Sequence, residues 1–378
     1  MPDAGRADDL RRVAVVTGSR ADFGLLRPVM RAVGSHAELE LLVIAAGSHL
    51  IAPALTFRDV KADFAVADSI PMQRAGRTTR ADDAEALGRG IARFTRSFAL
   101  LEPDWVVVLG DRIEAFAAAA AASVGGWALA HIHGGDRAEG VADEAMRHAI
   151  TKLAHLHLAA TAQSAERIGR MGERAEHVHV VGSPAIDDLS GIEPMGDERF
   201  AELGRPDTIF LMHPLGRSDE REEQDAASAL RGIAGRRVLA LMPNHDPGRR
   251  GVVRAIEVAG VRTAEHLPRA VFVGLLRRIA AGGVLVGNSS AGLIECAAVG
   301  VRAVNIGPRQ AGRERAGNVT ECENPTEQEV LEAVERSLAS TPSAEHPYGD
   351  GGAGYRIAQL LAELDPHEPG LNRKRCVY

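Results

Sequence analysis

Carboxylates and histidines follow predicted buried strands in the first half of the chain. Asp111 comes just after the apolar run 105–109, and His133 and Asp136 follow the run 127–132. Asp143 begins the next helical pattern. Because the carboxyl ends of parallel strands meet at one edge of a sheet, we expect these groups to converge there. Two carboxylates and histidines around one crevice can abstract and donate protons where burial and mutual repulsion separate their pKa values.

Each of these residues also has a structural interpretation. Asp111 precedes an Ala-rich helix, where a carboxylate is commonly an N-cap. Asp143 and Arg147 are four residues apart, a spacing that equally describes a surface ion pair. Arg20 lies where the first strand meets its loop, a ligand-binding position in open α/β sheets, but solvated loop arginines are also common there. No H-x-x-x-H or dense carboxylate motif favours a metal site.

A second group of candidates lies in the stretch 283–319. An apolar strand pattern, 283–286, ends in Gly-Asn-Ser-Ser, and a helix is predicted over 291–299. The hydroxyls of Ser289 and Ser290 and the first helical N–H groups would suit phosphate oxygens. Glu295 lies too deep in the helix to cap it and could accept the paired hydroxyls of a ribose. The alternative is that the two serines only cap the helix.

Arginines and one histidine accompany this stretch. Arg309, Arg313 and Arg315 crowd a short Gly-rich loop after the predicted strand 302–306, and guanidinium groups suit a diphosphate. His213 follows the predicted strand 208–212 and precedes a proline. A single histidine in such a place is usually structural.

Strands alternate with helical patterns along the whole chain, which predicts two α/β halves with parallel sheets. A Gly/Pro-containing, mixed-charge segment at 187–206 marks the boundary, so we expect domains at 1–190 and 191–378. The last helix is a candidate to pack back on the N-terminal domain. The polar segment 73–85 is interpreted as a surface loop able to close over a ligand, and the tail 372–378 is expected to be frayed. The remaining predicted strands cover residues 12–17, 39–46, 64–67, 156–160, 177–181 and 237–241.

Composition limits the classes of partner. The 51 acidic residues exceed the 44 basic ones, and aromatic residues make up only 4% of the chain, so we expect no nucleic-acid partner. No apolar run approaches about 18 residues, so we expect no membrane association through a spanning helix. Three widely spaced cysteines without C-x-x-C spacing indicate a reducing compartment and no zinc site. We therefore expect a cytoplasmic protein.

Several motifs together resemble the hydrolysing UDP-N-acetylglucosamine 2-epimerases. They are G-S-R-A-D-F-G-L-L near the start, G-D-R at 110–112, H-I-H-G-G with D-E-A-M-R-H-A-I-T-K, H-P at 213, P-N-H-D at 243, and G-N-S-S-A-G-L-I-E with G-P-R-Q-A-G-R-E. The resemblance extends through nearly the whole chain in the right order. It implies two Rossmann-like domains of the glycosyltransferase-B type, an active site in the interdomain cleft, a UDP-sugar substrate, a homodimer, and no metal or redox cofactor.

The resemblance also implies residue roles. Asp111 and Asp143 match catalytic positions, and His213 matches a position near the leaving phosphate. We add Arg147 and Arg313 as candidate substrate-binding residues. The positions that match nucleotide contacts are Arg20, Arg112, Asn244, Ser289, Ser290, Glu295 and Arg309.

One position departs from the family pattern. Many members have H-I-E-G-G where this chain has His131-Ile132-His133-Gly134-Gly135. Either Asp136 supplies the missing carboxylate or His133 is itself the acid–base group, since imidazole titrates near neutral pH. The loop to Asp143 is also one residue longer.

The family's reaction eliminates UDP from UDP-N-acetylglucosamine, passes through 2-acetamidoglucal and adds water to release N-acetylmannosamine. A UDP-2,4-diacetamido-trideoxyhexose would present the same reacting atoms. Sialic and legionaminic acid biosynthesis are the candidate pathways. The rival hypotheses are a non-hydrolysing epimerase, a glycosyltransferase on the same architecture, and a sugar-nucleotide-binding protein without turnover.

Overall fold

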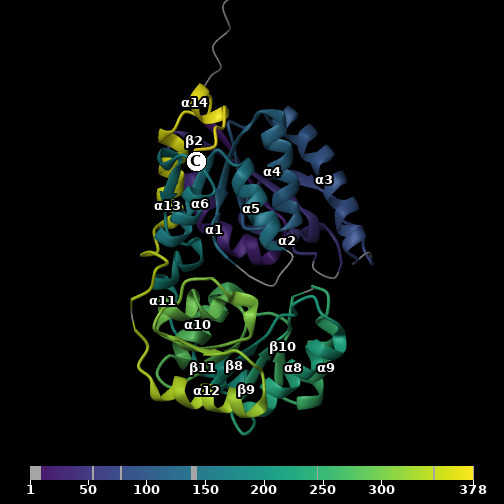
Figure 1. Ribbon diagram of the computed structural model, residues 1–378, viewed down its shortest axis with the longest axis vertical. Coiled ribbons are helices and arrows are strands. Elements are labelled where there is room, and N and C mark those ends of the chain that lie inside the picture. The colour runs from purple at the N-terminus through teal and green to yellow at the C-terminus, as the bar shows by residue number, and fades with distance from the viewer. Residues whose placement is uncertain are drawn as a thin grey trace, which may run out of the picture. The chain divides into compact units, whose positions relative to one another are not determined.

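The computed structural model describes residues 10–52, 55–76, 79–137, 143–244, 246–343 and 345–377, and the chain divides into two compact units (Figure 1). Unit 1 comprises residues 1–136, 145–187 and 349–378. Unit 2 comprises residues 137–144 and 188–348. The prediction of two α/β domains with parallel sheets is confirmed, since all the strand pairs of the described residues are parallel.

Unit 1 is a doubly wound sheet with the strand order β3-β2-β1-β4-β5-β6-β7. Alternate residues of β1 face opposite sides: Val13 and Val15 pack in the core with α1 and α13, and Ala14 and Val16 pack in the core with α3 and α4. Burial on both faces explains why the strands are continuous apolar runs. The strands are β1 (Arg11–Thr17), β2 (Leu39–Ala46), β3 (Val66–Ile70), β4 (Trp105–Leu109), β5 (Ala128–Ile132), β6 (Leu156–Ala159) and β7 (Val178–Val180).

The helices of unit 1 lie on both faces of this sheet (Figure 1). They are α1 (Arg20–Ser35), α2 (Phe57–Asp63), α3 (Arg80–Leu101), α4 (Ile113–Gly125), α5 (Asp143–Leu153), α6 (Ala162–Arg170), α13 (Ala353–Glu363) and α14 (Pro369–Asn372). Helix α3 begins inside the segment 73–85, for which the sequence predicts a loop, because Thr79 and Asp82 form a reciprocal capping box. Arg77, which belongs to the same segment, lies outside the described residues.

Unit 2 repeats the plan with a six-stranded sheet in the order β10-β9-β8-β11-β12-β13. Its strands are β8 (Thr208–Leu211), β9 (Val238–Leu241), β10 (Arg262–Ala264), β11 (Val284–Gly287), β12 (Arg302–Ile306) and β13 (Val319–Cys322). Its helices are α7 (Asp197–Glu202), α8 (Asp219–Gly232), α9 (Arg249–Ala259), α10 (Arg269–Ile279), α11 (Glu295–Val299) and α12 (Glu327–Ala339). The two short edge strands β10 and β13 were not predicted, because they carry little apolar patterning of their own.

The helix predicted over 291–299 is not continuous. A 3-10 turn, η5 (Ser290–Gly292), precedes the five-residue helix α11. The side-chain amide of Asn318 donates a hydrogen bond to the carbonyl of Gly292 (3.0 Å). In a continuous helix this carbonyl would accept from the backbone N–H of Cys296. The prediction of one continuous helix over 291–299 is therefore wrong.

The C-terminal residues belong to unit 1. Asp187 accepts hydrogen bonds from the amides of Ala353 (3.0 Å) and Gly354 (2.6 Å), so it caps α13. Gly354 lets α13 approach α1, because a Cβ there would lie 2.8 Å from the carbonyl oxygen of Pro28.

The expectation of a frayed tail was wrong for residues 373–377, which lie against unit 1. Lys374 Nζ donates to the carbonyl oxygens of Lys152 (2.7 Å) and Ala154 (2.6 Å) at the end of α5. The amide of Val377 donates to the carbonyl of Gly172 (2.9 Å). Within the described part of the chain, no helix combines the length and the apolarity needed to cross a bilayer.

Candidate active site

The candidate residues of unit 1 follow three neighbouring strands. β5, β4 and β1 are adjacent and parallel, so their carboxyl ends bring the segments 18–20, 110–112 and 133–136 to the same edge of the sheet. Arg20 is the first residue of α1 and is exposed, directly after the N-cap Ser19. This edge is where open α/β sheets bind ligands.

Asp111 is bound by a cation and does not cap a helix. The N-cap of α4 is Arg112, and the carboxylate of Asp111 forms an ion pair with Arg147 Nη2. Nη1 of the same guanidinium group donates to the carbonyl of His133 (3.2 Å). Arg147, from α5, thus connects the loops after β4 and β5. It is buried, and its i,i+4 pairing with Asp143 stays a prediction. Asp143 is the first residue of α5, and its side chain lies outside the described residues.

His133 and Asp136 form a buried pair. Their side chains are joined by a 2.8 Å hydrogen bond from His133 Nδ1 to Asp136 Oδ2, and the residues are 5% and 3% exposed. His133 Nε2 lies 3.0 Å from the hydroxyl of Ser183, and Asp136 Oδ1 accepts from Ser164 (2.8 Å). The backbone of His133 has a φ of 63°, which is uncommon for a non-glycine residue and often marks a functional position.

His131 braces this edge from inside the sheet. Its Nε2 donates to the carbonyl of Gly110 (2.8 Å), next to Asp111. Complete burial lowers the pKa of His131 to about 3, so the ring is neutral near pH 7. We assign His131 a structural role that joins β5 to the loop carrying Asp111.

Glu114 is a buried carboxylate at the same edge that our interpretation of the sequence missed. It accepts from Gln73 Nε2 (2.8 Å) and lies 3.4 Å from Arg112 Nε, while its side chain is 1% exposed. Glycine is required opposite it, since a Cβ at Gly18 would lie 2.5 Å from the Cβ of Glu114. A glutamate in the first turn of a helix is normally an exposed residue that favours the dipole, so no pattern in the sequence indicated its burial.

In unit 2, a buried asparagine holds His213. Asn288 Oδ1 accepts from the His213 amide (2.7 Å), and Asn288 Nδ2 donates to the His213 carbonyl (2.8 Å). The carbonyl of Asn288 in turn accepts from Gln310 Nε2 (2.9 Å). Asn288 and Gln310 therefore join the segments that follow β8, β11 and β12. Both residues lie in motifs of the sequence, G-N-S-S and G-P-R-Q-A-G-R-E, but those motifs drew attention to the serines and the arginines.

The side chain of His213 is neutral and oriented. Burial, and then the nearby positive charge of Arg309, lower the pKa of His213 to about 3. The backbone N–H of Asn244 donates to His213 Nδ1 (3.2 Å), so the ring proton is on Nε2. His213 can therefore donate a hydrogen bond through Nε2 across the neutral pH range. The side-chain oxygen of Asn244 is buried and finds no hydrogen-bond partner among the described residues.

The other candidates of unit 2 lie on the same edge of its sheet with different partners. Ser289 accepts from the amide of Ala291 (3.4 Å), as the capping interpretation predicts, and Ser290 begins η5. Arg309 Nη1 lies 3.5 Å from the carbonyl of Asn288. Glu295 forms an ion pair with Arg269 (3.5 Å), a partner that the sequence did not indicate.

The three arginines predicted to crowd one loop do not act alike. Arg313 Nε donates to the carbonyl of Arg137 (3.0 Å), and Arg315 pairs with Glu321. Arg309 is the one of the three that reaches Asn288.

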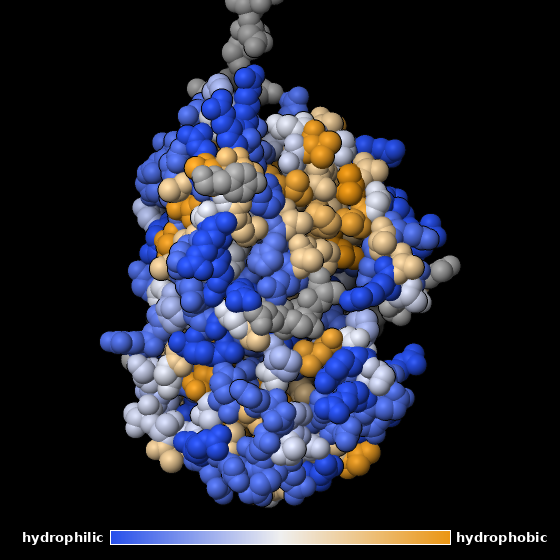
Figure 2. All heavy atoms as spheres, viewed as in Figure 1, coloured by the Kyte–Doolittle hydropathy of each residue, from blue (hydrophilic) through white to orange (hydrophobic). Residues whose placement is uncertain are grey.

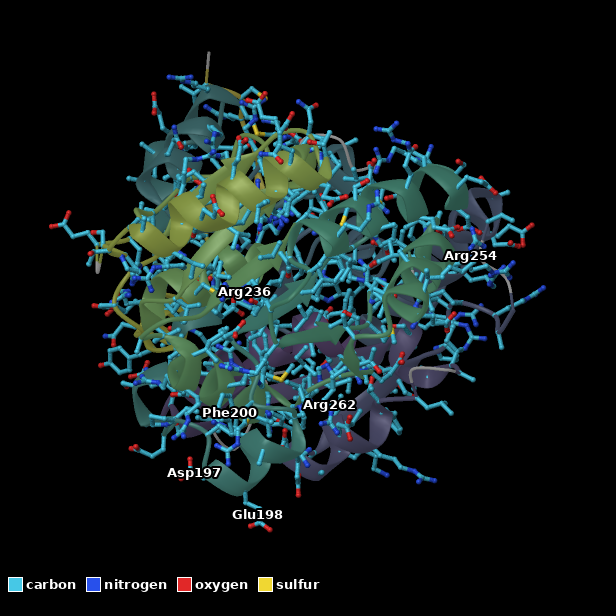
Figure 3. All side chains as sticks on the ribbon, turned by 90° about the horizontal axis from the view of Figure 1, so that it is seen from below. Asp197, Glu198, Phe200, Arg236, Arg254 and Arg262 are labelled. Carbon is cyan, nitrogen blue, oxygen red and sulfur yellow. The ribbon has the colours of Figure 1, made fainter. Side chains whose placement is uncertain are left out.

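Other arginines of unit 2 have structural partners elsewhere. Arg236 and Arg254, both labelled in Figure 3, form ion pairs with Asp207 (3.2 Å) and Glu223 (2.8 Å). Among the residues that the structure describes, no cluster of three or more His, Cys, Asp or Glu side chains could hold a metal ion.

Comparisons with known proteins give a consistent result. The family model described as UDP-N-acetylglucosamine 2-epimerase matches residues 31–362. A hydrolysing UDP-N,N'-diacetylbacillosamine 2-epimerase of Legionella pneumophila is 33% identical, over 96% of this chain and 99% of its own length. A UDP-N-acetylglucosamine 2-epimerase of Neisseria meningitidis is 30% identical, over 87% of this chain and 88% of its own.

Solved structures show the same fold. The crystal structure of UDP-GlcNAc 2-epimerase from Neisseria meningitidis bound to UDP-GlcNAc superimposes with a TM-score of 0.78 and 18% identity, covering 93% of this chain and 100% of that one. That of a putative UDP-N-acetylglucosamine 2-epimerase from Listeria monocytogenes gives a TM-score of 0.79 and 20% identity, covering 96% and 99%.

Proposed function

Since the chain belongs to the UDP-N-acetylglucosamine 2-epimerase family, we propose that it is a hydrolysing nucleotide-sugar 2-epimerase. The reaction converts UDP-N-acetylglucosamine and water into N-acetylmannosamine and UDP through 2-acetamidoglucal, or acts in the same way on a UDP-2,4-diacetamido-trideoxyhexose. The hydrolysing subtype is supported by the Legionella pneumophila relative and by a second hydrolysing relative from Campylobacter jejuni, 26% identical over 86% of this chain.

The observation that carries the proposal is the cluster of Asp111, Arg147 and His133 at one edge of unit 1. Elimination needs a base near C2 of the sugar, and hydration needs an acid at C2 and a base for water. Asp111 and the His133–Asp136 pair supply two proton-handling groups, and Arg147 connects the loops that carry them. We propose Asp143, the first residue of α5, as a further acid–base group.

Unit 2 supplies groups suited to a departing diphosphate. A neutral His213 that donates through Nε2, together with the guanidinium of Arg309, can stabilise negative charge on the leaving oxygen. The proposal requires that these groups and those of unit 1 act on the same substrate molecule. We propose as further nucleotide contacts Arg20, Arg112, Asn244, Ser289, Ser290, Glu295 and Arg313.

The experiment is proton NMR in deuterated water with two substrates, UDP-N-acetylglucosamine and UDP-N,N'-diacetylbacillosamine. We expect free 2-epimeric sugar carrying deuterium at C2, together with a stoichiometric amount of UDP. The substrate that is converted faster identifies the sugar on which the enzyme acts.

A non-hydrolysing epimerase is the second candidate, because the family includes relatives whose names do not specify hydrolysis. It would produce a reversible mixture of two nucleotide sugars without free sugar. Release of UDP only when an acceptor is added would identify a glycosyltransferase, and tight UDP binding without product would identify a non-catalytic binding protein.

We also propose a homodimer in the cytoplasm. Figure 2 shows hydrophobic side chains gathered over α3 and α4 of unit 1, and exposed apolar residues in these helices include Leu100 and Val124. The three cysteines are free, as is usual in a reducing compartment. Sedimentation equilibrium tests the dimer: a Val124→Glu variant that leaves the mass unchanged would contradict a dimer formed through this face.

The product would serve sialic or legionaminic acid biosynthesis. A relative from Escherichia coli named as a polysialic acid biosynthesis protein, 26% identical over 94% of this chain, supports this assignment.

A further inference from the structure

We infer that Ser164 and Asp136 are positioning residues that hold His133 as one tautomer, with its proton on Nδ1 and its lone pair on Nε2. The inference rests on the proposed function for its catalytic consequence, but the tautomer itself follows from hydrogen bonds inside unit 1. All the residues involved, His133, Asp136, Thr161, Ser164 and Ser183, are at least 95% buried.

The direction of each hydrogen bond on the Asp136 side can be deduced in order. Thr161, the N-cap of α6, accepts from the amide of Ser164 (3.0 Å) and donates its hydroxyl proton to Ser164 Oγ (3.1 Å). Ser164 therefore directs its own proton to Asp136 Oδ1 (2.8 Å). The second oxygen of Asp136 can only accept, so His133 must donate from Nδ1 (2.8 Å).

The other side of the imidazole agrees with this assignment. Ser183 Oγ accepts from the amide of Ala185 (3.2 Å), which leaves its hydroxyl proton for His133 Nε2 at 3.0 Å. Nε2 is then the acceptor. When the Ser183 hydroxyl turns away, Nε2 can take a proton from the substrate, whose electron pair stays behind. The imidazolium that forms is then paired with the Asp136 carboxylate.

The backbone around His133 is held for this arrangement. His133 has a φ of 63°, and the following turn needs Gly135, where φ is 74° and a Cβ would lie 2.2 Å from the carbonyl of Ser164. Arg167 donates to the carbonyl of Gly135 (3.2 Å), and Arg147 donates to that of His133 (3.2 Å). Strain of this kind persists only where the surroundings impose it, and it is common at functional sites.

Asp136 is therefore not the direct replacement for the family glutamate. Both of its carboxylate oxygens are occupied, by His133 and by Ser164, and the residue is 3% exposed. Nε2 of His133, in contrast, is held by the rotatable hydroxyl of Ser183. We therefore infer that His133 takes the proton and that Asp136 acts through it.

An Asp136→Asn variant tests the inference. Because Ser164 still donates to the amide oxygen, the amide nitrogen must face His133 Nδ1 and donate to it, which forces the ring proton onto Nε2. We expect kcat to fall by about 100-fold, as for the loss of a general base, while KM changes by less than about twofold. ¹⁵N NMR of histidine-labelled full-length protein, with the signal assigned through a His133→Gln variant, should show the reversed tautomer.

Removing the serine as well should restore part of the activity. In the double variant Asp136→Asn/Ser164→Ala, the amide can rotate and present its oxygen to His133 Nδ1. We expect the original tautomer to return and kcat to recover by about tenfold over Asp136→Asn, since a correctly placed base typically accounts for a factor of this size or more. A purely structural role would make the double variant worse than either single one.

Controls separate the inference from folding and from the proposed function. Ser97→Ala removes another buried serine of unit 1, whose hydroxyl has no partner among the described residues, and should leave kcat unchanged.

If Asp136→Asn fails to fold, Ser183→Ala replaces it: this variant should retain the Nδ1–H tautomer. A wild-type enzyme that releases no UDP from any nucleotide sugar would reject the function, whereas the tautomer would still be measurable. An active wild type with an unchanged tautomer and kcat in Asp136→Asn would overturn the inference.

Discussion

Asp111 is held by Arg147 on one side, and its side chain is 18% exposed, against 4% for that of Asp136. We expect Asp111→Asn to reduce turnover by at least about 100-fold, because an amide cannot act as a general base. Binding of UDP should remain within about twofold, since Asp111 is not among the proposed nucleotide contacts. Steady-state kinetics and calorimetric titration with UDP check both parts. Loss of UDP binding with residual turnover intact would reverse the assigned role.

Arg309 differs from its neighbours because it reaches the Asn288–His213 group. Arg309→Ala removes a charged hydrogen-bond donor worth about 1.5–3 kcal/mol, so we expect KM to rise by about tenfold or more. Arg302→Ala is the control on the preceding strand β12, because Arg302 donates to the carbonyl of Ser340. An unchanged KM in Arg309→Ala would remove this residue from the site.

At the level of elements, α5 depends on the C-terminal tail. Lys374 donates to carbonyl oxygens at the end of α5 and lies 2.6 Å from Glu173, so it acts as a cap supplied from a distant part of the sequence. We expect Lys374→Met to lower the free energy of unfolding by about 1–3 kcal/mol, because buried carbonyls and a carboxylate lose their partner. Urea denaturation measures this, with Arg375→Ala, an exposed neighbour, as the control.

The same tail has a consequence for the site. Helix α5 carries Arg147, so loosening its far end should also reduce turnover. Equal stability of the Lys374→Met and Arg375→Ala variants would show that the tail is not a structural cap.

At the level of the whole molecule, buried histidines make stability depend on pH. Burial lowers the pKa of His131 to about 3, and burial together with the charge of Lys374 lowers that of His155 to about 4. An unfolded histidine titrates near 6.5, so below this pH the unfolded chain binds protons that the folded chain does not. Stability should therefore fall on acidification from pH 6.5 towards pH 4, by about 1.4 kcal/mol per pH unit for each histidine.

Glu173 extends this loss to lower pH. Burial by itself would raise the pKa of Glu173, but hydrogen bonds from His157, Lys152 and Lys374 lower it to about 2. The contribution of Glu173 to the free energy of unfolding is present above pH 4.5 and is lost as the pH falls towards 2.

Urea midpoints at pH 7.5, 6 and 5 test the histidine effect. His155→Asn should flatten the pH dependence, since an amide oxygen can still accept from the amide of Leu129 but does not titrate. A pH profile identical to that of the wild type would contradict the assignment.

Sequence patterns were sufficient for the two α/β units because strands buried on both faces must be apolar runs, and helices must carry an apolar stripe. They also located Asp111, His133 and Asp136 after their strands, since parallel strands align their carboxyl ends. Short edge strands such as β10, and the interruption of the helix at Gly292, depend on contacts with distant residues and left no local pattern.

The partner of each polar group was decided only by the tertiary structure. Arg147 meets Asp111, Asn288 holds His213, and Lys374 caps α5 from a distant part of the sequence. Periodicity and spacing report which face of an element a residue occupies, whereas hydrogen bonds between residues far apart in the sequence depend on how the elements pack. For this protein the sequence alone therefore determined the fold class and the kinds of chemical group available, and packing determined which of those groups act together.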